Sequence, residues 1–368
     1  MSLKFGTSGL RGLSVDLEGP ATAPYATAFA RHLLAAGIAR QGDEILIGRD
    51  FRASSPAISA IAIAALRKAG FSPRDCGTLP TPALALLGLA RKAACLMVTG
   101  SHIPADRNGI KFYRPDGEID KADEAAITAA AETIRAEGLT FDAARETADD
   151  LHEAAMALYT ARNRTLLPEQ ALAGLRIGVY QHSTVARDLF VSVLAHYGAD
   201  VVALGRSESF IPVDTEAVSA ETIGLLQGWV GEHGLAAIIS ADGDGDRPLV
   251  TDETGTPLRG DLVGLIACRF LGATAVATPV TSNSGIEAAV SGTVLRTRVG
   301  SPFVIAAMNE AVVAGKAAVA GFEANGGTLT ATPFAVNGHM LSALPTRDSL
   351  MPVLAVLALA AGQSRPLS

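Results

Sequence analysis

The sequence predicts an α/β protein built from three similar mixed α/β domains. The first observation behind this prediction is an alternation of short apolar runs, rich in β-branched residues, with alanine- and leucine-rich stretches of helical periodicity. The second is a layout that recurs three times, in which an apolar strand runs into a polar loop and then into further strand-like sequence. A chain of 368 residues is long enough to hold three such domains.

Five apolar runs are expected to form buried strands. They lie at 44–50, 94–100, 175–180, 200–205 and 235–240. Between them, the stretches 55–70 and 183–198 have helical periodicity, begin with a serine that suits a helix N-cap, and end with glycine. Strands that alternate with helices in this way favour mostly parallel sheets.

The recurring layout also places the domain boundaries. It occurs in "CLMVTGSHIPADRNGIKFYRPDGEI", "LAAIISADGDGDRPLVTDETGTPL" and "KAAVAGFEANGGTLTATPF". In the first two, the second strand turns back through "RPDGE" and "DETGT", which are good hairpin signals. The charged, alanine-rich stretch 121–165 is the expected connector after the first unit, so we expect domains at 1–150, 151–257 and 258–368.

Composition excludes several classes of protein. A net charge of −7 without any block of lysine or arginine argues against binding to nucleic acid or to an anionic membrane surface. Cys76, Cys95 and Cys268 are scattered, which suits reduced thiols in a cytoplasmic protein better than a disulfide framework. The most apolar stretch near the end of the chain is interrupted by Pro352 and is shorter than the roughly 20 residues of a membrane span. We therefore expect a soluble, cytoplasmic protein.

The stretch "DGDGDRP" is the strongest candidate for a metal site. Its three aspartates alternate with glycine after a predicted strand: Asp242, Asp244 and Asp246. Their carboxylates can converge in an extended turn, and such a cluster suits a hard cation, magnesium or calcium. An EF-hand is the obvious rival because Glu253 stands at its twelfth position, but Arg247 replaces the required glycine and Pro248 continues as strand. A solvated Asp/Gly turn is the plain alternative.

The stretch "TGSHIPADRNGIK" places a serine at the mouth of a predicted strand. Taken singly, Ser101 reads as a turn residue, His102 as an ordinary polar side chain and Lys111 as a surface charge. Together they supply a nucleophile or phosphate carrier, a hydrogen-bond donor and a cation within one loop. Phosphoryl transfer needs that combination, because its catalysis consists mainly of positioning and charge neutralisation.

Three further loops have weaker signals. In "GFEANGG", Glu323 and Asn325 can bind vicinal sugar hydroxyls, although a plain glycine-rich turn is equally consistent with the sequence. The stretch "GTSGLRG" adds Thr7, Ser8 and Arg11, and arginine is well shaped to bind a phosphate with two hydrogen bonds. The stretch "GRDFRASS" is similar in character but reads as a strand end followed by a helix cap.

Taken together, "GTSGLRG", "TGSHIPADRNGIK", "DGDGDRP" and "GFEANGG" resemble, in order and spacing, the motifs of the α-D-phosphohexomutase family, of phosphomannomutase and phosphoglucomutase type. The resemblance extends over essentially the whole chain. It implies domains around a shared cleft and reversible phosphoryl transfer between C1 and C6 of a hexose phosphate. A phosphoserine at Ser101 and a hexose 1,6-bisphosphate intermediate or activator would carry that transfer.

The resemblance also implies residue roles. Mg²⁺ would be held by the three aspartates together with a phosphate oxygen on Ser101. Lys111 would be the general acid or base, and Arg11 and His102 would steady the phosphoserine. The implied substrate contacts are Thr7, Ser8, Arg247, Glu323 and Asn325. By the same resemblance, the three domains would carry the phosphoserine loop, the metal site and the sugar-recognition loop respectively.

Several departures from the family pattern bear on these roles. Ile103 follows the active-site histidine where asparagine is common, and Ser301 stands where a histidine is sometimes found, so Lys111 is left as the strongest acid/base candidate. The sugar loop lacks the run typical of glucosamine enzymes, which favours mannose and glucose phosphates. The family's usual fourth, phosphate-binding domain is not in the 368 residues, and we expect these to be the ordered part of a longer chain. A phosphoglucosamine mutase, a phosphosugar phosphatase and a non-catalytic phosphosugar-binding protein are the alternatives, and the oligomeric state stays open.

Overall fold

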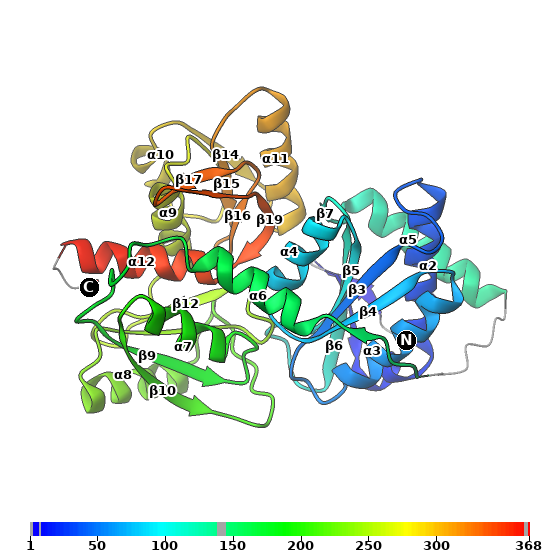
Figure 1. Cartoon of the computed structure of the whole chain (residues 1–368), viewed down its shortest axis with the longest axis horizontal. Coiled ribbons are helices and arrows are strands. Elements are labelled where there is room, and N and C mark those ends of the chain that lie inside the picture. Colours follow the sequence, from blue (N-terminus) through cyan, green and yellow to red (C-terminus); the bar gives the residue numbers. More distant parts are fainter. Residues whose placement is uncertain (1–2, 7–8, 138–144, 364–366) are drawn as a thin grey trace. The chain divides into compact units, whose positions relative to one another are not determined.

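The computed structural model describes residues 3–6, 9–137, 145–363 and 367–368 (Figure 1). The chain divides into two compact units, Met1–Leu158 and Tyr159–Ser368, and the division falls within helix α6 (His152–Asn163). Each unit has the alternating strands and helices that the sequence predicts. The prediction of three mixed α/β domains is confirmed, since the C-terminal unit contains two separate main sheets.

The N-terminal unit is built on one mixed sheet of eight strands in the order β1-β2-β6-β5-β3-β4-β8, with β7 paired to β6. Its strands are β1 (Lys4–Phe5), β2 (Leu10–Leu13), β3 (Glu44–Arg49), β4 (Ser72–Thr78), β5 (Ala94–Val98), β6 (Arg107–Arg114), β7 (Gly117–Glu118) and β8 (Asp149–Asp150). Strand β3 runs parallel to β4 and β5, whereas β6 is antiparallel to both β5 and β2. The antiparallel return of β6 is what brings the loop after β5 back toward β2.

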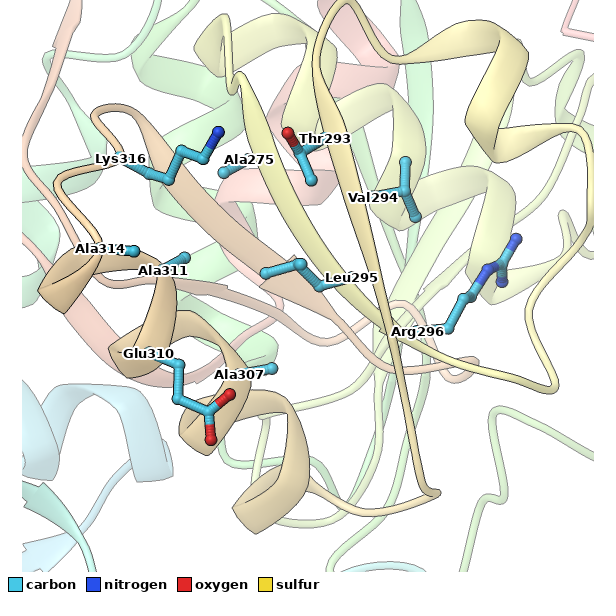
Figure 2. Close-up of a pocket in the computed structure, with 10 residues that line it drawn as sticks. All are labelled: Ala275, Thr293, Val294, Leu295, Arg296, Ala307, Glu310, Ala311, Ala314 and Lys316. Carbon is cyan, nitrogen blue, oxygen red and sulfur yellow. The ribbon is translucent and has the colours of Figure 1, made fainter.

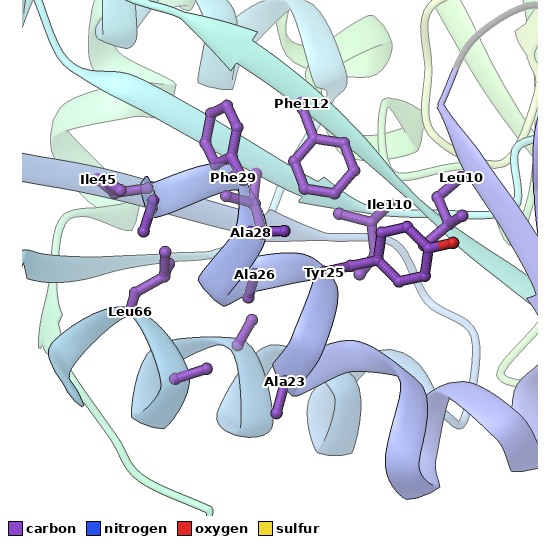
Figure 3. Packing of buried hydrophobic residues seen from close by; sticks show 14 of the residues in the cluster. Leu10, Ala23, Tyr25, Ala26, Ala28, Phe29, Ile45, Leu66, Ile110 and Phe112 are labelled. Atoms are coloured by element: carbon purple, nitrogen blue, oxygen red, sulfur yellow. The ribbon is translucent and has the colours of Figure 1, made fainter. Parts of the chain in front are cut away.

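Helices cover both faces of this sheet. They are α1 (Ser14–Asp16), the π-helical turn η1 (Leu17–Ala21), α2 (Thr22–Ala35), α3 (Ser55–Lys68), α4 (Thr81–Arg91) and α5 (Lys121–Ala136). Successive strand residues point to opposite faces. Accordingly, Ile47 packs into the core under α2 and α3, whereas a side chain at Gly48 would meet Leu84 of α4. Figure 3 shows the first of these cores, in which the Phe29 and Phe112 ring centroids lie 5.0 Å apart. Burying each such ring contributes on the order of 1.5–3 kcal/mol.

The C-terminal unit contains a four-stranded sheet in the order β10-β9-β11-β12 and a five-stranded sheet in the order β14-β13-β15-β16-β19. The strands of the first sheet are β9 (Arg176–His182), β10 (Asp200–Arg206), β11 (Ala237–Ala241) and β12 (Pro248–Val250). Those of the second are β13 (Ala275–Pro279), β14 (Thr293–Thr297), β15 (Val319–Phe322), β16 (Thr328–Thr330) and β19 (Leu344–Asp348). A separate hairpin joins β17 (Phe334–Val336) to β18 (His339–Leu341).

The helices of this unit are α7 (Arg187–His196), α8 (Ala220–His233), α9 (Gly260–Leu271), α10 (Ile286–Ala289), α11 (Ser301–Val313) and α12 (Leu350–Gln363). Helix α7 packs against β9 and β10, and α11 packs against β13 and β15. Helix α12 contacts both α9 and β12, so it ties the second sheet of the unit to the first.

The predicted strands are confirmed within a residue or two at either end. Both hairpin turns are confirmed as well, since Tyr113 pairs with Glu118 and Thr251 bridges to Pro257. Both predicted caps are wrong. The Ser55 hydroxyl donates to Asp50 Oδ1 at 2.6 Å instead of capping α3. The Ser183 hydroxyl donates to the Ile211 carbonyl oxygen at 3.2 Å, and α7 begins only at Arg187.

The predicted connector at 121–165 is not one continuous helical segment. Its first part is α5, whose buried face (Ile127, Ala131 and Ile134) belongs to the core of the N-terminal unit. An amphipathic helix buries that face against a neighbour, and α5 packs against α2. The connection between domains therefore lies after α5, and 138–144 are outside the described residues.

Candidate active site

Ser101 lies in the loop between β5 and β6 of the N-terminal unit. It is buried, and its φ of 55° is a left-handed conformation that is uncommon for a residue other than glycine. The Ser101 backbone N–H donates to Thr99 Oγ1 at 2.8 Å, and the Ser101 hydroxyl lies 3.1 Å from His102 Nδ1. Strained backbone of this kind persists only where surrounding contacts hold it, and it clusters at functional sites.

Arg52 holds the Ser101 loop, and sequence reasoning missed it. Its guanidinium donates to four backbone carbonyls of the loop: those of Ser101 (3.0 Å), Ile103 (2.6 Å), Pro104 (2.7 Å) and Arg107 (2.9 Å). Arg52 Nε also lies 3.2 Å from Asp50 Oδ2, which accepts from Thr99 Oγ1 at 2.8 Å. Burial raises the pKa of the Asp50 carboxyl above its ordinary value, and the Arg52 charge opposes that rise.

Gly100 leaves the space that Arg52 occupies. A methyl group at position 100 would lie 2.7 Å from Arg52 Cζ, closer than real contacts allow. We therefore expect Gly100→Ala to displace the guanidinium, release the loop carbonyls and lower turnover at least tenfold, about 1.4 kcal/mol in the barrier. Gly224→Ala is the matched control, because Gly224 lies within helix α8 and a methyl group there meets nothing within 4 Å. Steady-state kinetics of both variants test the prediction, and an unchanged turnover for Gly100→Ala would contradict it.

Two predicted cations lie on strands beside this loop. Lys111 is buried on β6, opposite Met97 of β5. Arg11 is on β2, opposite Gly109 of β6. Strand pairing thus brings both predicted residues to the part of the sheet that carries the Ser101 loop. The predicted contacts Thr7 and Ser8 lie outside the described residues.

The metal loop, residues 242–247, joins β11 to β12 in the C-terminal unit. Its three aspartates are fully buried, and one carboxylate oxygen from each lies within 4.8 Å of the others. Asp242 Oδ1 also accepts the backbone N–H groups of Asp246 (3.2 Å) and Arg247 (3.1 Å), which closes the loop. Three buried, converging carboxylates form the hard oxygen donor set that Mg²⁺ prefers, so these residues fit the implied cation.

Arg347, at the end of β19, contacts the metal loop directly and was also missed from the sequence. Its Nε and Nη2 atoms both donate to Asp246 Oδ2, at 3.1 and 2.8 Å. Its Nη1 atom donates to Glu323 Oε2 at 2.5 Å. The guanidinium therefore balances two buried carboxylates at once. The only sequence signal was an isolated arginine before the last helix, in "PTRDSL".

The sugar loop, residues 323–327, joins β15 to β16 in a tight turn. The Glu323 N–H donates to Gly327 O at 3.1 Å, and Asn325 Oδ1 accepts the Gly327 N–H at 3.0 Å. A methyl group at Gly260 would lie 2.3 Å from the Ala324 carbonyl oxygen, so the start of α9 packs directly on this loop. The Asn325 oxygen thus supports the turn, while Glu323 carries the charge of the loop.

Arg247 extends the cluster of charges in this unit. It is buried, its Nη1 lies 3.5 Å from Glu216 Oε2, and its Nε lies 4.0 Å from Asp246 Oδ1. Burial raises the pKa of Glu216, which the Arg247 charge opposes and the Glu323 charge reinforces. The C-terminal unit thus brings the predicted residues Arg247, Asp246 and Glu323 into one charged cluster with Glu216 and Arg347.

A cavity beside the second sheet of this unit is separate from the charged cluster. It has a volume of about 440 Å³ and lies between β14 and α11 (Figure 2). Its lining is apolar at Val294 and Leu295 and charged at Glu310 and Lys316. None of the predicted site residues that the structure describes lines it. In the described parts of the chain, the helices lack the combination of length and apolar character that a membrane span requires.

Comparison with known proteins assigns the family. The three α/β/α domains of phosphoglucomutase/phosphomannomutase match in order, domain I at residues 2–138, domain II at 158–255 and domain III at 259–368. A phosphomannomutase of Sinorhizobium fredii is 59% identical over 100% of this chain and 78% of its own length. The chain belongs to the phosphoglucomutase/phosphomannomutase family.

More distant relatives carry two different names within the family. A phosphomannomutase of Salmonella muenchen is 43% identical, over 96% of this chain and 72% of its own. A phosphoglucosamine mutase of Sphingopyxis alaskensis is 33% identical, over 99% of this chain and 80% of its own. The fold agrees with a crystal structure of a phosphoglucomutase/phosphomannomutase family protein from Burkholderia thailandensis, with a TM-score of 0.76 at 20% identity over 97% of this chain and 76% of that one. These relationships support phosphohexomutase activity.

Proposed function

We propose that the protein is a Mg²⁺-dependent phosphohexomutase that moves a phosphoryl group between C1 and C6 of a hexose phosphate. The observation that carries this proposal is the held position of Ser101, a buried hydroxyl in a left-handed conformation on a loop clamped by Arg52. A protein that only bound phosphosugars would have no use for a serine constrained in this way. In this assignment, 1–150 is the phosphoserine-loop domain, 151–257 the metal-binding domain and 258–368 the sugar-recognition domain.

In the proposed reaction, Ser101 carries a phosphoryl group on Oγ. The hydroxyl oxygen of the bound hexose phosphate bonds to phosphorus, the Ser101 Oγ–phosphorus bond breaks, and a hexose 1,6-bisphosphate results. The proton of the sugar hydroxyl passes to Lys111, and His102, 3.1 Å from Ser101 Oγ, steadies the serine oxygen. After the bisphosphate reorients, its other phosphoryl group returns to Ser101 by the same steps in reverse.

The remaining residues supply charge and orientation. Asp242, Asp244 and Asp246 would hold Mg²⁺, which when bound offsets the negative charge of the phosphoryl group. We assign phosphate contacts to Arg11, Arg247, Thr7 and Ser8, and sugar contacts to Glu323 and Asn325. The buried Glu323 carboxylate can accept hydrogen bonds from the sugar hydroxyls. These hydrogen bonds would be similar in the two orientations that the sugar takes during the reaction.

Mannose and glucose phosphates are the proposed substrates. The relatives at 59% and 43% identity are both named phosphomannomutases, whereas six relatives named phosphoglucosamine mutases are 29–34% identical. We place the reaction in the cytoplasm, which the three free and buried cysteines support.

A turnover assay tests this function. We expect mannose 1-phosphate and glucose 1-phosphate, with Mg²⁺ and a hexose 1,6-bisphosphate, to be converted to 6-phosphates at least tenfold faster than glucosamine 1-phosphate. Removal of Mg²⁺ with a chelator should stop the conversion, and addition of Mg²⁺ should restore it. Inorganic phosphate released in step with substrate loss would instead indicate a phosphatase, and binding without conversion would contradict both catalytic functions.

A further inference from the structure

Arg347 links the metal loop to the sugar loop of the C-terminal unit. Two of its N–H groups converge on Asp246 Oδ2, at 3.1 and 2.8 Å, and a third reaches Glu323 Oε2 at 2.5 Å. The guanidinium is planar and its donors have a fixed geometry. One side chain, itself 2% exposed, therefore sets the orientation of Asp246 relative to Glu323.

The surrounding structure is built to hold Arg347 in this position. A methyl group at Gly327 would lie 2.7 Å from Arg347 Cδ, so the glycine of the sugar loop makes room for the side chain. Two residues further on, the Ser349 hydroxyl donates to the carbonyl oxygen of Gly245 in the metal loop at 2.7 Å. The end of β19 thus holds the metal loop at two points.

We infer that Arg347 is a positioning residue that couples cation binding at the aspartates to the charge on the sugar loop. This inference rests on the proposed function, which assigns both sites. Asp246 and Glu323 share one guanidinium, so loss of charge on Glu323 removes one of the two carboxylates between which the guanidinium charge is divided. Arg347 then competes more strongly with a cation for the Asp246 carboxylate. By linkage, a cation on Asp246 must release Arg347 toward Glu323 to the same extent.

The consequence for the enzyme is that the metal and sugar sites do not act independently. When the hydroxyls of a sugar donate hydrogen bonds to Glu323, less of the Glu323 negative charge is available to Arg347. The guanidinium then binds Asp246 more strongly, which changes the affinity of the metal loop for its cation. Arg347 itself need not touch the sugar for this effect. Its role is to transmit a change at one carboxylate to the other across a single buried side chain.

A double-mutant cycle with Mn²⁺ as the probe tests the coupling in the full chain. In the otherwise unchanged protein, Glu323→Gln should lower Mn²⁺ affinity, measured by electron paramagnetic resonance titration, at least about fivefold. In the Arg347→Lys background, the same change should alter affinity less than about twofold beyond Arg347→Lys alone. Lysine keeps the positive charge but cannot place its ammonium group on both carboxylates in the fork geometry of arginine.

Glu216→Gln is the matched charge control. Glu216 forms an ion pair with Arg247 at 3.5 Å and interacts with Arg347 only through space, so Glu216→Gln removes a charge of the same cluster without removing a hydrogen bond of the Arg347 fork. Its removal should change Mn²⁺ affinity less than about twofold. Gly327→Ala is the second variant, because it displaces Arg347 without deleting it and should reduce the coupling as Arg347→Lys does. It keeps the inference testable if Arg347→Lys fails to fold.

The outcomes separate this inference from the proposed function. An equal loss of Mn²⁺ affinity from Glu323→Gln in both backgrounds would mean that the charges act through space, which overturns the coupling while leaving the metal site in place. Mn²⁺ binding that is absent, or that is insensitive to Asp244→Asn, would overturn the proposed metal site and the inference together. The inference about Arg347 is supported if Glu323→Gln lowers Mn²⁺ affinity in the otherwise unchanged protein but no longer does so in the Arg347→Lys and Gly327→Ala backgrounds.

Discussion

Replacing Ser101 with alanine is expected to abolish mutase turnover while leaving the fold intact. The hydroxyl is the only group at this position that can carry the phosphoryl group, and nucleophilic catalysis ends when the nucleophile is removed. Freshly purified protein should contain a fraction heavier by one phosphate in an intact-mass spectrum. That fraction should be missing from Ser101→Ala. Full activity in the variant would rule out the assignment.

The structure explains why the loss should be chemical and not conformational. The loop is held through backbone groups, because Arg52 binds the carbonyls of Ser101 and Ile103, and Thr99 accepts the Ser101 N–H. None of these contacts uses the serine hydroxyl. The thermal midpoint of Ser101→Ala should therefore stay close to that of the unchanged protein.

Two further variants control for this interpretation. Ser101→Gly also removes the hydroxyl, but it suits the φ of 55° better, so it should be equally inactive and at least as stable. Ser72→Ala, at the start of β4, removes a serine hydroxyl away from the loop and should keep its activity. Loss of stability in both Ser101→Ala and Ser101→Gly would instead indicate that the hydroxyl supports the loop, whereas a loss in Ser101→Ala alone would indicate strain of the alanine side chain at a φ of 55°.

The parts of the site that the sequence predicted are those whose members are close together in the chain. The aspartates of the metal loop alternate with glycine within five positions, and strand periodicity places them directly after a buried strand. Ser101 and His102 are adjacent, and Lys111 follows on the next strand, which pairs back on β5. Local spacing and strand ends were sufficient to place these groups in two loops and on the strand that follows the first of them.

The two arginines that organise these loops were not predictable in the same way. Arg52 binds carbonyls 49 to 55 residues away, and backbone carbonyls have no signature in a sequence. Arg347 binds Asp246 and Glu323, which precede it by 101 and 24 residues. Both arginines become meaningful only when the fold brings distant segments together. No pattern in the sequence marks Gly100 and Gly327 as the glycines that make room for these two arginines.

Replacing Asp244 with asparagine is expected to lower Mg²⁺ affinity and turnover together, by at least two orders of magnitude each. One of three charges that balance the cation is lost, and an amide oxygen is a weaker ligand than a carboxylate for a hard cation. Isothermal titration with Mg²⁺ measures the first effect and steady-state kinetics the second. Asp200→Asn is the control, because it removes an exposed carboxylate of the same unit outside the triad and should change neither quantity.

The stability of the metal-free protein distinguishes a cation site from a structural turn. The triad oxygens lie within 4.8 Å of one another, where like charges repel by a few kcal/mol at an effective dielectric constant of about 20. Asp244→Asn removes part of that repulsion. Its thermal midpoint without metal should therefore equal or exceed that of the unchanged protein, while the increase in midpoint that Mg²⁺ gives should disappear. A clear fall in metal-free stability with unchanged turnover would show instead that the three aspartates serve only to shape the loop.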